Sequence, residues 1–314
     1  MTESVFFSVI IPNYNHGLYL KQRIDSVLGQ TFTDFEIIIL DDCSSDNSKS
    51  IIESYKSNPK ITKVVYNQIN SGSTFKQWQK GIELAKGNYI WIAESDDYCS
   101  VDFLETINRY ILQSTKSLGL VYTQTIDVDE NNEVILHRKD VTKDFVPNIW
   151  EHDFILSGHD FITNYLKVKN VIPNASAVVF SKSLISNTLF DKELLQMKMA
   201  GDWLFWIKLC EKSDIAFIAK ELNFFRNHKL VSRNHNTAVK KINRVMEEKY
   251  IREYITTHIK VNQDEEWKTL YKLWFKNKAI SSVFDRSFYK PKYSKMSIAK
   301  YLQLFYLSKF KKHH

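Results

Sequence analysis

The sequence predicts an α/β fold: one mostly parallel sheet with helices on both faces, followed by a helical C-terminal extension. The first observation is that apolar, β-rich runs alternate with helix-length segments near the start of the chain. The runs at residues 7–12, 35–40, 62–66 and 89–93 predict buried strands. The amphipathic segments that separate them, at residues 18–28, 46–55 and 75–85, predict helices.

Strands separated by helices imply crossover connections and therefore a parallel sheet of the Rossmann-like kind. In such a sheet, ligands bind beyond the carboxyl ends of the strands. We therefore expect the polar residues that directly follow these four strands to contribute to the site.

The second observation is a change of rhythm after about residue 118. Three further segments predict strands, at residues 119–125, 175–180 and 215–219, while 202–210 predicts a helix and 129–133 a polar turn. The third observation is that residues 239–258 and 265–310 predict helices, interrupted near Pro291. These patterns predict one domain over residues 1–235 and a helical extension over residues 236–314.

The composition indicates a globular protein of a reducing compartment. Of the 314 residues, 44% are hydrophobic and 25% charged, which is ordinary for a folded domain. Cys43, Cys99 and Cys210 are widely spaced and form no Cys-x-x-Cys pair, which argues against a disulfide framework and against a zinc cluster. The first strand follows Met1 without a basic leader, and no apolar run reaches the roughly 20 residues that a spanning helix needs. We therefore expect a cytoplasmic protein.

The positive charge is concentrated in the tail. The net charge is +7, but eight basic residues and no acidic residue follow Asp285, so the rest of the chain is close to neutral. This distribution argues against a nucleic-acid-binding protein. The apolar, lysine-flanked segment 296–310 is suited to an anionic membrane surface, which predicts peripheral contact with the inner face of the membrane. The alternative is a helix that packs on the domain and keeps its lysines in solvent.

Two acidic clusters follow predicted strands. Asp41, Asp42 and Asp46 follow the second strand, and the sequence Glu94-Ser95-Asp96-Asp97 follows the fourth. Like charges crowded together are unfavourable unless a cation or hydrogen-bond donors compensate them. Mg²⁺ or Mn²⁺ is the simplest compensator, because these ions prefer carboxylate, water and phosphate oxygens. The alternative for Asp41 and Asp46 is a structural role as turn or helix-capping residues.

Six stretches of the first hundred residues resemble a known family when they are taken together and in order. They are residues 7–15, 26–31, 36–44, 70–72, 80–87 and 89–97. This pattern resembles the family 2 glycosyltransferases of GT-A fold. The resemblance implies an inverting transfer of a sugar from a nucleotide diphosphate donor, usually a UDP-sugar, to a hydroxyl of a glycan or lipid-linked acceptor, in cell-surface polysaccharide synthesis. It divides the domain into a nucleotide-binding half, residues 1–117, and an acceptor-binding half, residues 118–235.

The resemblance also assigns roles in the first half. Pro12, Asn13 and Tyr14 would line the base pocket, and Asp42, with or without Asp41, would hydrogen-bond the uracil. Other residues that the resemblance implies in nucleotide-sugar binding are Asn70, Gly72, Glu94 and Asp96. Asp96 would stand at the ribose or metal position, with Asp97 as a further metal or diphosphate contact. Glu94 replaces the first aspartate of the family's Asp-x-Asp signature, so which of the three acids touches the metal stays open.

The resemblance implies further roles in the second half. Asp202, in Gly201-Asp202-Trp203, would be the catalytic base, and Trp203 an apolar wall for a sugar ring; a helix cap and a core residue are the alternatives. Arg226 would contact the diphosphate or the metal, and His228 the metal. His235 is a weaker candidate.

Two other kinds of protein remain as alternatives. One is a catalytically silent relative that keeps the nucleotide pocket. The other is a dinucleotide-dependent oxidoreductase, which the turn Pro12-Asn13-Tyr14-Asn15-His16-Gly17 disfavours because it lacks the Gly-x-Gly-x-x-Gly fingerprint.

Overall fold

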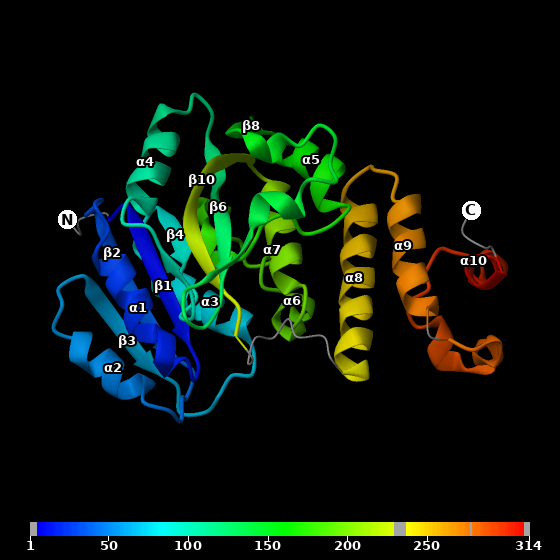
Figure 1. The fold of residues 1–314 in the computed structure, drawn as a ribbon, viewed down its shortest axis with the longest axis horizontal. Coiled ribbons are helices and arrows are strands. Elements are labelled where there is room, and N and C mark those ends of the chain that lie inside the picture. Colours follow the sequence, from blue (N-terminus) through cyan, green and yellow to red (C-terminus); the bar gives the residue numbers. More distant parts are fainter. Residues whose placement is uncertain (1–4, 229–236, 277, 311–314) are drawn as a thin grey trace.

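The computed structural model describes residues 5–228, 237–276 and 278–310. Its centre is a ten-stranded sheet in the order β3-β2-β1-β4-β9-β6-β10-β5, with β7 paired to β6 and β8 paired to β10 (Figure 1). The strands are β1 Phe7–Asn13, β2 Phe35–Asp41, β3 Ile61–Tyr66, β4 Tyr89–Ile92, β5 Tyr98–Cys99, β6 Leu118–Val128, β7 Val134–His137, β8 Phe154–Leu156, β9 Val178–Ser181 and β10 Asp214–Arg226.

The first four strands along the sheet, from β3 to β4, are all parallel, as predicted. β1 and β2 are buried over their whole length, which explains why both read as unbroken apolar runs. Their register pairs Asn13 with Asp41, so the carboxyl ends of the two strands lie next to each other.

The second half of the sheet continues the same strand direction across one reversed strand. β9 is antiparallel to both β4 and β6, and β10 is parallel to β6. The carboxyl ends of β4, β6 and β10 therefore lie on the same edge as those of β1 and β2. β10 runs to Arg226, well beyond the predicted strand at residues 215–219, and so carries the residues that follow it to this edge.

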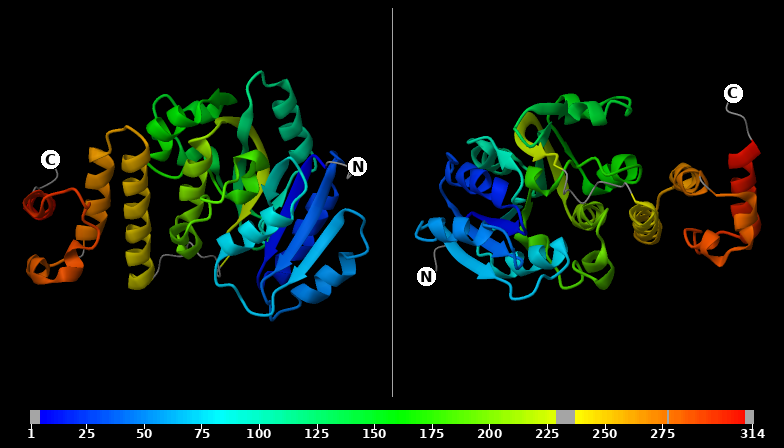
Figure 2. Two further views of the ribbon diagram at one scale, coloured as in Figure 1. Left: turned by 180° about the vertical axis from the view of Figure 1, so that it is seen from behind. Right: turned by 60° about the horizontal axis from the view of Figure 1, so that its bottom comes forward.

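Helices cover both faces of the sheet, as the α/β prediction requires (Figures 1 and 2). α1, α2 and α4 contribute apolar side chains to the core on one face, and α3 and α7 contribute to the core on the other. The helices are α1 Gly17–Leu28, α2 Ser48–Tyr55, α3 Thr74–Leu84, α4 Phe103–Gln113, α5 Gly158–Phe161, α6 Lys192–Gln196, α7 Gly201–Cys210, α8 Ala238–His258, α9 Asp264–Phe275 and α10 Ile298–Phe310.

The C-terminal helices form their own aromatic cluster at one end of the molecule (Figure 2). Phe275 of α9 packs against Tyr301 and Phe305 of α10, with ring centroids 5.1 and 5.0 Å apart. α8 contributes Ile251 and Ile255 to the core around α7 and Val245 to the aromatic cluster, so it connects the two. The predicted boundary at residue 235 lies outside the described residues and stays a prediction.

The tail helix α10 packs against α9 within the extension, with Tyr301 and Phe305 buried in the aromatic cluster. Its outer surface still exposes Ile298 and Phe310. None of the helices in the described part of the chain is long and apolar enough to cross a bilayer. Contact with a membrane surface remains a prediction.

Candidate active site

The first acidic cluster, after β2, is held by hydrogen bonds from the protein itself. The carboxylate of Asp42 accepts four, from Asn67, from Gln77 and from both the amide and the hydroxyl of Ser71. That of Asp41 accepts hydrogen bonds from Asn13 Nδ2 at 2.7 Å and from the amide and hydroxyl of Ser44. Both carboxylates are buried. Their negative charge is therefore compensated without a cation.

Asp46 has the structural role that its sequence allowed. Its two carboxylate oxygens accept the amides of Gly17, at the start of α1, and of Ser48, at the start of α2. One side chain thus satisfies a terminal amide of each of two helices. Although partial burial raises the pKa of Asp46, these hydrogen bonds lower it below the ordinary value.

The residues expected around the nucleotide lie at this same edge. Pro12 and Asn13 end β1, and Tyr14 follows them with its side chain exposed. Asn70 donates to the backbone carbonyl of Asp42 and accepts the amide of Gly72, whose φ of 66° is left-handed. The structure therefore brings these five residues together around the β1 and β2 ends, and their contacts with a nucleotide stay predictions.

The second acidic cluster contains three carboxylates with three different surroundings. Asp97 is buried and accepts hydrogen bonds from Asn174, Ser176 and the amide of Arg226. Glu94 accepts one from Trp78 Nε1, at 2.9 Å. Asp96 instead faces two imidazoles: His228 Nε2 is 2.9 Å from its Oδ2, and His16 Nδ1 is 4.0 Å from its Oδ1.

These surroundings separate the protonation of the three acids. Burial and the neighbouring Asp96 charge raise the pKa of Glu94 to about 8 and that of Asp97 to about 7. Burial also acts to raise the pKa of Asp96, but the hydrogen bond from His228 and the electrostatic effect of the nearby His16 and His228 side chains lower it to about 2. Of the three acids, Asp96 is therefore the one that is fully ionised near neutral pH.

Among the described residues, Asp96, His228 and His16 form a group that could hold a metal ion. Their ligand atoms all lie within 4.8 Å of one another. A divalent ion such as Mn²⁺ fits this set, because imidazole nitrogen and carboxylate oxygen are both ligands that it accepts. Asp97 and Glu94 lie outside the set, and a role for Asp97 as a ligand remains only a prediction.

Arg226 holds the segments around this set together. Its guanidinium donates to the carbonyl of Asp96, to Asn132 in the turn after β6 and to Gln22 of α1, and its amide donates to Asp97. The side chain is only 1% exposed. The diphosphate contact predicted from the sequence would require some of these hydrogen bonds to break, so in this structure Arg226 positions Asp96.

Asp202 lies in the first turn of α7, partly exposed. Its Oδ2 accepts a hydrogen bond from Asn170 Nδ2 at 3.0 Å, and its Oδ1 accepts the amide of Trp203. The surrounding protein raises the pKa of Asp202 above the ordinary value by desolvation. A carboxylate that gains a proton more readily is better suited to general-base chemistry near neutral pH.

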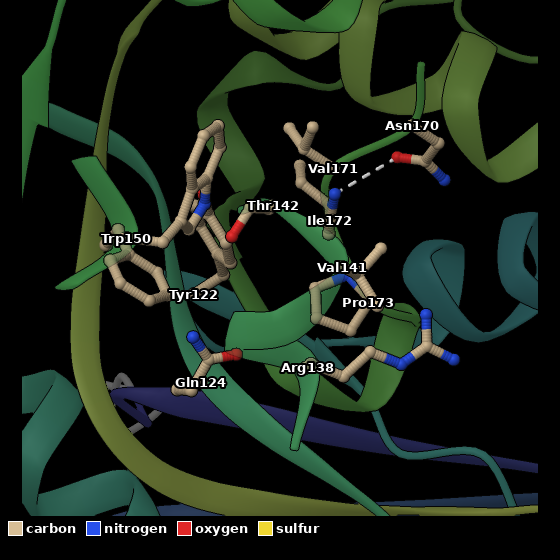
Figure 3. Close-up of a pocket in the computed structure, with 11 residues that line it drawn as sticks. Tyr122, Gln124, Arg138, Val141, Thr142, Trp150, Asn170, Val171, Ile172 and Pro173 are labelled. Atoms are coloured by element: carbon tan, nitrogen blue, oxygen red, sulfur yellow. Dashed lines mark hydrogen bonds between the residues drawn. The ribbon is translucent and has the colours of Figure 1, made fainter. Parts of the chain in front are cut away.

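Asn170, which the sequence analysis missed, orients Asp202. Its Oδ1 accepts a hydrogen bond from the amide of Ile172 at 3.2 Å (Figure 3). This bond fixes the side-chain amide, whose Nδ2 donates to Oδ2 of Asp202. Asn170 also borders a cavity of about 20 Å³ lined by Tyr122, Trp150 and Pro173 among others. That volume holds about one water molecule, so this cavity is too small for a sugar.

The predicted role of Trp203 in sugar binding is wrong. It was expected to form an apolar wall for a sugar ring, but only 1% of it is exposed and its Nε1 donates to the carbonyl of Leu166. The alternative, a core residue, is what the structure shows. The apolar run around Trp203 indicated burial, and helix α7 is indeed buried along most of its length.

An open depression of about 550 Å³ lies between the loop that precedes α3 and the helix α6. It is lined by Ser71, Gly72, Ser73, Lys76, Lys192, Leu195, Gln196 and Lys198. Ser73 Oγ donates to the carbonyl of Leu195 and ties the two walls together at 2.7 Å. The depression has three lysines, and one of its lining residues, Ser71, hydrogen-bonds to the carboxylate of Asp42. Both features suit a phosphorylated ligand.

Comparison with known proteins identifies the family. The model of glycosyl transferase family 2 matches residues 8–176, which is more than half of the chain. The chain belongs to glycosyl transferase family 2. The match includes β1, β2 and β4 with both acidic clusters, and it ends before Asp202, Arg226 and His228.

Curated relatives match parts of the chain. Glycosyltransferase GlyG of Streptococcus pneumoniae is 28% identical over 198 residues, covering 60% of this chain and 59% of GlyG. The poly(ribitol-phosphate) β-N-acetylglucosaminyltransferase TarS of Staphylococcus aureus is 34% identical over 107 residues, covering 33% of this chain and 18% of TarS. The matches thus span less than two thirds of these relatives.

Solved structures of other glycosyltransferases share the fold over nearly the whole chain. TarS residues 1–349 in complex with UDP-GlcNAc give a TM-score of 0.61 at 18% identity, covering 96% of this chain and 81% of that one. The mannosyltransferase PcManGT of Pyrobaculum calidifontis, in complex with GDP-Man and Mn²⁺, gives 0.56 at 12% identity, with 99% and 89% covered. These likenesses confirm the predicted GT-A fold.

Proposed function

We propose that this family 2 protein is an inverting, metal-dependent glycosyltransferase that moves a sugar from a UDP-sugar to a hydroxyl of a glycan or lipid-linked acceptor in polysaccharide synthesis. The observation that carries the proposal is the pairing of Asp96 with His228 at the carboxyl edge of the sheet. Two proposed metal ligands that are far apart in the sequence meet there, beside the loops that the family uses to bind its nucleotide. UDP as the nucleotide is supported by TarS, which is described in complex with UDP-GlcNAc.

In the proposed reaction, Asp202 accepts the proton of the acceptor hydroxyl as that oxygen bonds to the anomeric carbon. The bond from this carbon to the diphosphate breaks on the opposite face, which inverts the configuration. Asp96 and His228 would hold the metal, which when bound neutralises the charge of the departing diphosphate. Asn170 holds the Asp202 carboxylate in a fixed orientation.

The two parts of the site are connected through the core. Glu94, next to the metal-binding segment, accepts a hydrogen bond from Trp78, whose ring packs 5.3 Å from Phe205 and 6.0 Å from Trp206 of α7. This rigid packing supports a fixed relation between Asp96 and the helix that carries Asp202.

The proposal is tested by the thermal stability of the protein with UDP, in the presence of Mn²⁺ or of EDTA. UDP should raise the melting temperature, as a ligand selective for the native state does, and should raise it more with Mn²⁺. Equal stabilisation in EDTA, or no stabilisation by UDP, would contradict the proposal. Hydrolysis of UDP-sugars in the same buffers separates an enzyme from a catalytically silent relative, and a panel of donors identifies the sugar.

A further inference from the structure

We infer that His16 is a third metal ligand, so that His16, Asp96 and His228 form a preassembled site of two imidazoles and one carboxylate that selects a transition-metal ion such as Mn²⁺ over Mg²⁺. The inference rests on the proposed metal dependence and adds to it the ligand and the class of ion. Neither the family resemblance nor the acidic motifs point to His16.

The first step is the geometry of the three ligands. Donor atoms bound to one ion at about 2.1 Å lie about 3.0 Å apart when they are adjacent and about 4.2 Å apart when they are opposite. His228 Nε2 and Asp96 Oδ2 are 2.9 Å apart, and His16 Nδ1 and Asp96 Oδ1 are 4.0 Å apart. One ligand atom from each of the three residues lies within 4.8 Å of the others, so small side-chain rotations would bring all three to one ion.

The second step is that the start of α1 does not require an imidazole at residue 16. The residue is the N-cap of α1, a position that favours Ser, Thr, Asp, Asn or Gly, and its side chain makes no capping hydrogen bond. Instead the ring turns toward the second acidic cluster, where Nδ1 lies 2.8 Å from Ser95 Oγ. Its ring centroid is 5.4 Å from that of His228, in an edge-to-face arrangement.

The third step is access. The side chain of His228 is 3% exposed, that of Asp96 15% and that of His16 25%. An ion therefore approaches from the His16 side, where water and phosphate oxygens can complete its coordination.

The fourth step is the choice of ion. Mg²⁺ prefers oxygen ligands and releases its water reluctantly, whereas imidazole nitrogen suits later first-row ions. Two nitrogens among three protein ligands therefore disfavour Mg²⁺. From the sequence alone, Mn²⁺ and Mg²⁺ are equally suitable ions, because only carboxylates and His228 are predicted there as ligands.

The test is pulsed electron paramagnetic resonance of Mn²⁺ bound to the full chain without UDP, which counts coordinated imidazole nitrogens directly. We expect two in the parent protein and one in His16→Asn, whose side-chain amide keeps a polar atom near Ser95. His137→Asn is the matched control, because His137 forms a similar pair with a carboxylate, Glu221, at 2.7 Å but lies on β7. It should retain two.

The affinity for Mn²⁺ alone should fall by at least about 10²-fold in His16→Asn, and the preference for Mn²⁺ over Mg²⁺ should shrink with it. One imidazole in the parent protein would overturn the inference and leave the proposed metal-dependent function intact. Absence of Mn²⁺ binding in the presence and absence of UDP would overturn both.

Discussion

The two acidic clusters lie at the same edge of one sheet, yet the protein treats them differently. After β2, the protein's own amides and hydroxyls occupy the carboxylates of Asp41 and Asp42. After β4, Asp97 is occupied in the same way, but the carboxylate of Asp96 faces the imidazole nitrogens of His228 and His16, a group that could hold a metal ion. Acidic residues at strand ends are therefore not equivalent, and the hydrogen-bond donors around each one indicate whether it supports the fold or binds a cation.

The largest effect should come from Asp96. In Asp96→Asn, sugar transfer should fall on the order of 10³- to 10⁴-fold, because a metal that stabilises the leaving group contributes several kcal/mol. Mn²⁺ binding should be lost while the melting temperature changes little. Calorimetric titration with Mn²⁺ and a donor-hydrolysis assay measure both. If Asp96→Asn bound Mn²⁺ as tightly as the parent, Asp96 would not be a metal ligand, and the two clusters would not differ in this function.

Asp202→Asn should lower turnover by roughly 10²- to 10⁴-fold, the usual contribution of a positioned general base, with UDP affinity unchanged. The parent rate should fall as the pH drops through the pKa of Asp202, because protonation removes the base. Since desolvation raises this pKa, the fall should begin above the ordinary range of an aspartate. The pH profile of kcat/KM measures this fall in rate. If Asp202→Asn instead lost stability and UDP affinity together, Asp202 would be a structural helix cap.

Asp97→Asn should act on stability. The new amide nitrogen would face at least one of the donors from Asn174, Ser176 or Arg226 that now point at the carboxylate. We expect a loss of about 1–3 kcal/mol in the free energy of unfolding, the cost of unsatisfied buried donors. Urea denaturation and Mn²⁺ titration distinguish a structural role of Asp97 from a role as a metal ligand. Normal stability with weakened Mn²⁺ binding would show that Asp97 is a ligand.

The smallest effect should come from Asp46→Ala, about 0.5–1 kcal/mol, because the side chain is exposed and caps two helices. The folded-state pKa of Asp46 lies below its unfolded value, so its contribution is present at neutral pH and is lost as the pH falls through the folded-state pKa. Melting temperatures between pH 6 and pH 3 should therefore fall more steeply in the parent than in the variant. Parallel curves would show that the cap contributes nothing.

The sequence by itself determined the sheet and its functional edge. Apolar runs separated by amphipathic segments could form only crossover units, so β1, β2 and β4 had to be parallel and had to end together. Asp96 and Asp202 stood out because acids directly after a buried strand or opening an apolar helix are local patterns. The same rule about polar residues at strand ends applied to His16, but an imidazole in a turn gives no local sign of its partner.

Only the tertiary structure decided which carboxylates are already satisfied and which residues meet. The hydrogen bond between Asp96 and His228 joins residues 132 apart, and that between His16 and Ser95 joins residues 79 apart. Neither periodicity nor residue type encodes such pairs, because they depend on where β10 ends relative to β1 and β4 in the folded sheet. For the same reason the sequence presented Arg226 and Trp203 as ligand contacts. Packing made one the support of Asp96 and the other part of the core.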